Sequence, residues 1–220
     1  MVLEVDNIEL NFKHKRILSG IYVKAEMGSV TGILGGNGSG KSSLFNIIFG
    51  NLKPKYKLVR INGEPILKPL YKTGLVKYLP QYHFVPIGIK IRNIFKLFNV
   101  CWSDFVQSFE TFEKYKNQKI NKLSSGERRV VETYIILKSK STITILDEPF
   151  SHIAPLYVET IINLICEEKE RKIILISDHL YKHIIDSADQ IYLLKNGTTK
   201  EINNLRNLED YKYLNDGQLD

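Results

Sequence analysis

The sequence predicts an α/β fold built on a parallel sheet with helices on both faces. A short apolar run at 30–34 leads through a glycine-rich segment into a helix-like stretch at 44–49. Two further apolar runs, at 143–146 and 172–176, are nearly continuous and are followed by acids or histidine. Such runs are typical of parallel strands that are buried on both faces. Strand-like and helix-like segments alternate along the chain, as they do in α/β proteins.

The composition is that of an ordinary globular protein. The chain has 220 residues, of which 43% are hydrophobic and 25% charged, which suits one domain with or without an inserted subdomain. Cys101 and Cys166 form no CxxC pair, so we expect free thiols rather than a disulfide or a metal site. No apolar run approaches the ~20 residues of a membrane-spanning helix, and residues 1–12 do not resemble a secretory signal. We therefore expect a cytoplasmic protein.

The net charge is +7 at pH 7. Three interpretations of this basic balance stay open: a solvated surface, attraction to the anionic face of a membrane, and attraction to nucleic acid. Net charge alone does not choose among them.

Local patterns place the remaining elements in order. Residues 2–12 and 21–23 read as strands, and Asn62-Gly63 predicts a tight hairpin after another strand. Between 84 and 122, aromatic and aliphatic residues recur at helical spacing, which predicts a small helical insertion. The stripe formed by Phe105, Phe109 and Phe112 is expected to form its core. Pro155 fits the first turn of a later helix, and residues 205–214 read as a short closing helix.

The glycine-rich segment after residue 34 matches the P-loop pattern of a phosphate-binding site. Glycines allow backbone N–H groups to converge on phosphate oxygens, and the next helix directs its positive end at the same anion. A lysine supplies a mobile charge for the terminal phosphates, and the following hydroxyl can bind Mg²⁺. The residues of this predicted nucleotide site are Gly35, Gly36, Asn37, Gly38, Ser39, Gly40, Lys41, Ser42 and Ser43.

Two adjacent carboxylates follow the apolar run at 143–146. Asp147 and Glu148 would lie at the carboxyl end of a buried strand, the edge at which such sheets bind ligands. We expect Asp147 to bind Mg²⁺, directly or through water, and Glu148 to orient and deprotonate the attacking water. Alone, such a pair also fits a turn that caps a helix. Here the pair lies downstream of a P-loop in an α/β pattern, and this context favours the catalytic interpretation.

Motifs around these two sites together resemble the ABC ATPase family, and the resemblance covers nearly the whole chain. Residues 123–127, Leu-Ser-Ser-Gly-Glu, resemble the LSGGQ signature and lie shortly before the Asp147 strand. Gln81 resembles the Q-loop glutamine and His179 the switch histidine. Phe12 resembles the aromatic residue that stacks on adenine, although a lone phenylalanine is more often part of a core. Each match is weak alone, but the set in this order is specific.

The resemblance implies the architecture of the chain. It predicts a P-loop NTPase (RecA-like) core with an antiparallel β subdomain and an inserted helical subdomain. The whole of 1–220 would be one ABC ATPase domain. Its nucleotide-binding core would comprise 1–83 and 123–220, and the helical insertion 84–122.

The resemblance also implies roles around ATP and Mg²⁺. Loop 35–43 would bind the phosphates, with Ser42, Gln81 and Asp147 at the metal. Gln81 would also sense the attacking water and link the site to the inserted helical region, and Glu148 would be the catalytic base. Lys41 and His179 would contact the γ-phosphate.

The signature motif implies a dimer. Ser124 and Gly126 would act in trans and close over ATP bound to the other subunit, giving a head-to-tail homodimer or a pair of cassettes. A glycine-containing loop that leads into a helix, here expected at 127–137, is a second anion site in any case. The sequence departs from the family's pattern at Gly36, at Ser125 in place of a glycine, and at Ala154 in place of an aspartate. The last two put the strength of closure and the communication between sites in question.

The favoured function is the ATP-hydrolysing subunit of an ABC transporter, peripheral on the inner face of the cell membrane through separate transmembrane permease subunits. Nucleic acid is not expected as a partner. An alternative is a soluble ABC ATPase that acts in translation, cluster assembly or on DNA. A P-loop kinase is a third class, but it leaves 123–127 and 147–149 without a purpose. A zinc site at His179 and His183 is not expected, because the H-E-x-x-H pattern is absent.

Overall fold

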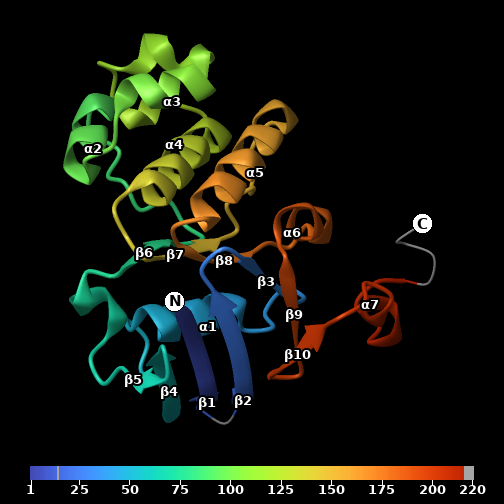
Figure 1. The fold of residues 1–220 in the computed structure, drawn as a ribbon. Helices are drawn as coiled ribbons and strands as arrows, with labels where there is room; N and C mark the ends of the chain where they lie inside the picture. The colour runs from blue at the N-terminus through green and yellow to red at the C-terminus, as the bar shows by residue number, and fades with distance from the viewer. Residues whose placement is uncertain (14, 216–220) are drawn as a thin grey trace.

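The computed structural model describes residues 1–13 and 15–215, and they form two sheets with helices between and around them (Figure 1). The first sheet is antiparallel and has four strands in the order β2-β1-β4-β5. Its strands are β1 (Val2–Phe12), β2 (Lys15–Glu26), β4 (Tyr56–Ile61) and β5 (Glu64–Pro65).

The second sheet has six strands in the order β10-β9-β3-β8-β7-β6. All neighbours are parallel except β9 and β10, which form an antiparallel pair. The strands are β3 (Val30–Leu34), β6 (Val76–Leu79), β7 (Ile143–Asp147), β8 (Ile173–Ser177), β9 (Gln190–Lys195) and β10 (Thr198–Ile202). The mixed architecture confirms the predicted α/β class.

Helices cover both faces of this second sheet. Helix α1 lies on the side of the antiparallel sheet, whereas α4, α5 and α6 lie on the opposite side (Figure 1). The helices are α1 (Lys41–Phe49), α2 (Ile91–Phe98), α3 (Trp102–Ser108), α4 (Ser125–Lys138), α5 (Pro155–Lys169), α6 (Tyr181–Ser187) and α7 (Asn207–Asp210). Short 3-10 helices are η1 (Leu70–Thr73), η2 (Glu110–Tyr115) and η3 (Ile120–Lys122). No helix within the described ranges combines the length and hydropathy that crossing a membrane requires.

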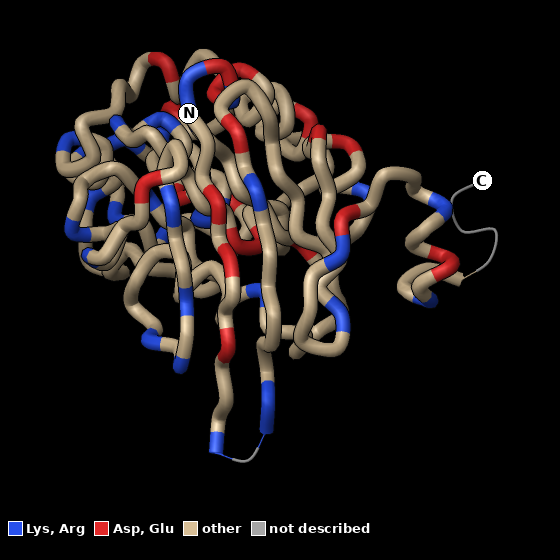
Figure 2. The backbone as a smooth tube through the Cα atoms, turned by 60° about the horizontal axis from the view of Figure 1, so that its bottom comes forward, with Lys and Arg blue, Asp and Glu red and all other residues tan. Residues whose placement is uncertain are grey.

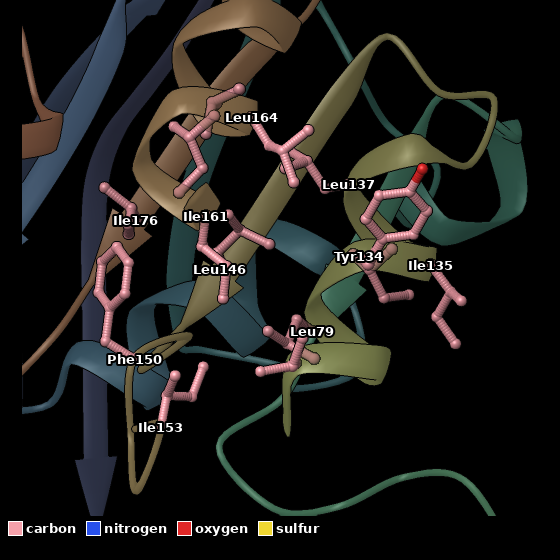
Figure 3. Packing of buried hydrophobic residues seen from close by; sticks show 14 of the residues in the cluster. Leu79, Tyr134, Ile135, Leu137, Leu146, Phe150, Ile153, Ile161, Leu164 and Ile176 are labelled. Carbon is pink, nitrogen blue, oxygen red and sulfur yellow. The ribbon is translucent and has the colours of Figure 1, made fainter. Parts of the chain in front are cut away.

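Successive residues of the central strands enter two different hydrophobic cores. In β8, Ile173 and Leu175 pack with α1 and the antiparallel sheet, whereas Ile174 and Ile176 pack under α4, α5 and α6. Figure 3 shows the second core, in which Leu146 of β7 lies among side chains of α4 and α5. Both faces are therefore apolar, which explains why these strands lack alternation in the sequence.

An aromatic cluster holds the helices of residues 91–115 on α4. The ring of Phe105 lies between 4.9 and 5.3 Å, centroid to centroid, from five other aromatic rings: those of Phe95, Trp102, Phe109, Phe112 and Tyr134. Phe105 and Phe112 are fully buried, and Phe109 is 2% exposed. The predicted core of this helical segment is confirmed, and Tyr134 shows that α4 forms its floor.

Several local predictions can be compared directly with the structure. Asn62 and Gly63 both have positive φ, 52° and 82°, in the tight turn between β4 and β5, as the Asn-Gly pair predicts. Pro155 is the first residue of α5. The closing helix is shorter than expected: α7 covers four residues, whereas the sequence predicts a helix over most of 205–214.

Basic residues are interspersed with acidic ones over both sheets and the helices (Figure 2). On the antiparallel sheet, Glu9 of β1 forms an ion pair with Lys55 at 3.2 Å. Asp6 of β1 forms an ion pair with Arg60 of β4 at 3.9 Å. Such exposed pairs contribute little to stability.

We predict that Phe105→Ala lowers the free energy of unfolding by about 3–5 kcal/mol, because it removes a buried ring that five others contact. Chemical denaturation of the purified chain measures this. Leu97→Ala, on the exposed face of neighbouring α2, is the matched control and should change stability by less than about 0.5 kcal/mol. Equal losses in the two variants would contradict the proposed core.

Candidate functional site

The glycine-rich loop connects the carboxyl end of β3 to the first turn of α1. Gly38 and Gly40 have φ of 74° and 108°, a left-handed conformation that side chains with a Cβ rarely adopt. A Cβ on Gly35 would lie 2.6 Å from Oγ of Ser39 and 2.7 Å from the Leu194 carbonyl. Glycine is therefore required for both the shape of the loop and its packing. The loop curls around the amino end of α1, where backbone N–H groups can face an anion.

Lys41 is buried at the base of this loop. Its Nζ donates hydrogen bonds to the carbonyls of Gly35, at 2.7 Å, and Gly36, at 3.3 Å. Burial lowers the pKa of Lys41, while the nearby carboxylates of Glu148 and Asp147 act in the opposite direction. The ammonium is thus held by two neutral carbonyls, which an incoming phosphate can replace with a stronger charged partner.

Asp147 ends β7 and is fully buried beneath the loop. Its carboxylate accepts hydrogen bonds from the hydroxyls of Ser177, at 2.6 Å, and Tyr78, at 3.2 Å. Burial raises the pKa of Asp147, and the hydrogen bonds from Ser177, Ser42 and Tyr78 offset part of that rise. The same surroundings raise the pKa of the Tyr78 hydroxyl. A buried carboxylate beside the Ser42 hydroxyl is a pair of hard oxygen donors, the kind that Mg²⁺ prefers.

Glu148 follows Asp147 in a strained conformation. Its φ is 54°, in the left-handed region that few residues other than glycine adopt. Its carboxylate Oε2 lies 3.6 Å from Nδ1 of His179, and the same nitrogen lies 3.4 Å from Oδ1 of Asp178. Strain of this kind concentrates at functional positions, where the surrounding structure maintains it. Here it turns the carboxylate toward the cleft.

Arg129, which the sequence patterns did not single out, holds this backbone in place. Its guanidinium is buried and donates to the carbonyls of Pro80, Asp147 and Glu148. Asp178 has a similar role, because its carboxylate accepts from the N–H groups of Phe150 and Leu180. Neither residue belongs to a short motif, and their partners are distant in sequence. Only their proximity to the signature and to His179 could have indicated them.

Most of the predicted residues line one cleft of about 790 Å³, whereas Gly35, Gly36 and Asp147 are not part of its lining. Lys41 and the phosphate loop, Glu148, His179, Gln81 and Phe12 all contribute to its lining. Phe12 is 50% exposed, so it is available as a platform for a ring and does not belong to the core. The complete lining is Phe12, Ile17, Asn37, Gly38, Ser39, Gly40, Lys41, Ser42, Ser43, Gln81, Tyr82, His83, Ser125, Arg129, Glu148, Ser151, His152 and His179.

Ser124 and Gly126 do not line this cleft, although Ser125 between them does. Ser124 caps α4: its Oγ accepts from the Glu127 N–H, and its own N–H donates to the Glu127 carboxylate. A Cβ on Gly126 would lie 2.1 Å from the carbonyl oxygen of His152, so only glycine fits there. Ser124 is thus exposed at the amino end of α4 and is not part of the lining of this cleft.

Residues 1–13 and 15–215 contain no group of three or more His, Cys, Asp or Glu side chains arranged to bind a metal ion. His183 instead packs against the ring of Phe150, with centroids 4.8 Å apart.

The comparisons with known proteins agree with this geometry. The family model described as ABC transporter matches residues 18–151, more than half of the chain. An uncharacterized ABC transporter ATP-binding protein of Methanocaldococcus jannaschii is 28% identical and aligns with 99% of this chain and 84% of its own length. The lipopolysaccharide export system ATP-binding protein LptB of Haemophilus influenzae is 26% identical over 89% of this chain and 88% of its own.

Solved structures give the same result. The ADP conformation of MJ1267, an ATP-binding cassette of an ABC transporter, is 26% identical, has a TM-score of 0.69, and matches 90% of this chain and 89% of its own. The ATP-binding subunit of another ABC transporter shares the fold with a TM-score of 0.82 at 20% identity, over 100% of this chain and 96% of its own. The chain therefore belongs to the ABC transporter family, as an ATP-binding and ATP-hydrolysing subunit.

Proposed function

We propose that this ATPase works as a head-to-tail dimer that binds Mg²⁺ with ATP and drives separate transmembrane subunits. The observation that carries the proposal is the separation of two phosphate-binding elements in one chain. Lys41 and the other residues of 37–43 line the cleft together with Ser125, whereas Ser124 and Gly126 on either side of Ser125 do not. A second copy in the opposite orientation brings its signature turn to the open side of that cleft.

The phosphates of ATP bind to loop 35–43. N–H groups of the loop and the amino end of α1 surround the β- and γ-phosphates, and Lys41 moves from the Gly35 and Gly36 carbonyls to the γ-phosphate. Phe12 lines the same cleft, and its exposed ring is a surface on which adenine would stack.

The residues present suit Mg²⁺. Ser42, Asp147 and the amide oxygen of Gln81 are hard oxygen donors, and the raised pKa of Asp147 reflects a buried carboxylate that a nearby cation would stabilise in its ionised form. When bound, Mg²⁺ would neutralise part of the phosphate charge. Tyr78 and Ser177 keep the Asp147 carboxylate in a fixed orientation.

Glu148 is the base of the hydrolysis step. Its carboxylate is directed into the cleft near His179, where it can orient water and accept its proton as the water oxygen attacks the γ-phosphorus. His179 and Lys41 stabilise the charge on the transferring phosphoryl group. ADP leaves with the electron pair of the broken P–O bond, and inorganic phosphate is the second product.

The helical segment 84–122 is the part through which we expect permease subunits to be driven. It projects from the parallel sheet above α4, and exposed apolar residues at its surface include Ile87 and Leu97. Docking there would place the ATPase at the inner face of the cell membrane through its partners. Co-expression with candidate permeases and membrane fractionation tests this. A chain that stays in the soluble fraction with every permease tested favours the soluble alternative.

We predict that Lys41→Ala abolishes ATP turnover and weakens ATP binding by about tenfold or more, because a charge-assisted bond to phosphate is lost. Equilibrium binding of labelled ATP and phosphate release measure the two effects. Lys53→Ala, an exposed lysine outside the cleft, is the control and should behave like the native chain. Full activity in Lys41→Ala would refute the assignment of the phosphate loop.

Glu148→Gln should reduce turnover by about 100-fold or more while ATP remains bound, because the amide cannot accept the proton of water. With ATP and Mg²⁺ it should form a dimer that gel filtration detects. Glu110→Gln, on the exposed surface of η2, is the control. Normal turnover by Glu148→Gln would exclude it as the base, and a persistent monomer in saturating ATP–Mg²⁺ would exclude the dimer.

Asp147→Asn should raise the Mg²⁺ concentration that gives half-maximal turnover by about tenfold or more, because a neutral amide binds a hard cation more weakly than a carboxylate does. Titration of turnover with Mg²⁺ at fixed ATP measures this, and excess chelator should stop turnover of the native chain. Asp104→Asn in α3 is the matched control. An unchanged Mg²⁺ requirement would remove Asp147 from the metal site.

A further inference from the structure

Three side chains in series join the loop after β6 to the first turn of α4. Nε2 of His83 lies 3.0 Å from Oγ of Ser125, and Nδ1 of the same ring lies 2.8 Å from Oε2 of Glu132. Glu132 is fully buried, and its other oxygen accepts from Nε of Arg128 and from the Val85 N–H. Both ring nitrogens of His83 are therefore hydrogen-bonded, Nδ1 with Glu132 and Nε2 with Ser125.

The partners of Glu132 determine how His83 meets Ser125. A carboxylate paired with Arg128 is only an acceptor, so Nδ1 of His83 carries the proton of that hydrogen bond. The Ser125 hydroxyl can donate or accept, so it bonds Nε2 whether or not that nitrogen carries a proton. The side chain at this signature position is thus turned toward the loop instead of rotating freely.

This contact connects two segments to which the proposed function gives separate roles. Gln81, two residues before His83, lines the cleft around Lys41. Ser125 lies between Ser124 and Gly126, which face the partner's ATP in the proposed dimer. Among residues 1–13 and 15–215, the His83–Ser125 contact is the only hydrogen bond between loop 80–90 and residues 124–127.

The other bonds between this loop and α4 involve the body of the helix. Arg129 donates to the Pro80 carbonyl, and Arg128 donates to the Val85 carbonyl. They attach both ends of the segment 80–85 to α4, and His83 lies between these two attachments. From there the imidazole is the direct route to the first turn.

We propose that His83 is a positioning residue that transmits nucleotide occupancy at Lys41 to the signature turn of the same subunit. The proposal rests on the proposed function, because it requires Gln81 to respond to ATP and Ser124 and Gly126 to contact the partner's ATP. In the dimer this link couples the two ATP sites, and by linkage the coupling acts in both directions. Ser125, which replaces the family's glycine, supplies the hydroxyl that makes the link possible.

Two substitutions at His83 separate its two hydrogen bonds. The short amide of His83→Asn can occupy the place of Nδ1 and bond Glu132, but it does not reach Ser125. The longer amide of His83→Gln can reach the place of Nε2 and Ser125. A residue that merely stabilised the loop would tolerate Asn as well as Gln, so the pair distinguishes transmission from support.

The experiment measures amide hydrogen exchange of the full chain carrying Glu148→Gln, with and without ATP–Mg²⁺. The protein concentration is kept where gel filtration shows only monomer, so that no partner can protect the signature turn. We expect ATP to slow exchange by about twofold to tenfold in both 80–86 and 124–128, the size of one hydrogen bond. With His83→Asn or Ser125→Gly, ATP should slow exchange in 80–86 alone. His83→Gln should restore the effect in 124–128.

Each other outcome contradicts a specific statement. If ATP slows exchange in 80–86 but not in 124–128 of the native-His83 chain, or if His83→Asn leaves the response of 124–128 unchanged, the transmission role of His83 is wrong. If His83→Gln fails to restore it, the contact with Ser125 is not the route. If ATP slows exchange in neither segment, the response of Gln81 to ATP, and with it that part of the proposed function, fails instead.

Discussion

The buried guanidinium of Arg129 is the interaction on which the rest of the site depends. It donates to carbonyls at the carboxyl ends of two adjacent parallel strands, Pro80 after β6 and Asp147 and Glu148 at the end of β7. Main-chain carbonyls at a strand end have lost their ladder partners, and leaving them buried and unpaired is costly. One planar donor satisfies three of them at once. The positions of the Gln81 loop and of Glu148 follow from this arrangement.

The charged groups beneath the phosphate loop show opposite effects of the same burial. Burial lowers the pKa of Lys41 and raises the pKa of Asp147. The folded state holds the Asp147 proton more tightly than the unfolded chain does. The contribution of Asp147 to stability is therefore lost as pH rises from its pKa in the unfolded chain through its higher pKa in the folded state. A bound phosphate and a cation offset both desolvation costs. In the proposed complex, binding of ATP with Mg²⁺ would therefore stabilise the fold at these two groups.

Contiguous motifs are predictable from the sequence, and residues defined by distant contacts are not. Lys41, Asp147 and Glu148 lie directly after strands or the loop that follows one, so the strand pattern alone places them at one edge of the sheet. Arg129 and Tyr78 act on groups far away in sequence, and no local spacing reports such partners. The first turn of α4 is different, because its signal is local. Ser124 and Glu127 have the spacing of a capping box, so the helix begins at Ser125 and not at residue 127 as expected.

In the proposed dimer, Ser124 must cap α4 and also contact a phosphate in the partner's site. Its Oγ accepts from the Glu127 N–H, and a hydroxyl has one donor and two acceptor positions. The hydroxyl proton therefore remains available to an anion while the cap is intact. Gly126 adds an N–H at the same helix end, and the close approach of the His152 carbonyl fixes its backbone. A helix end that is capped on one side can thus still present donors on the other, which is the arrangement a shared ATP site requires.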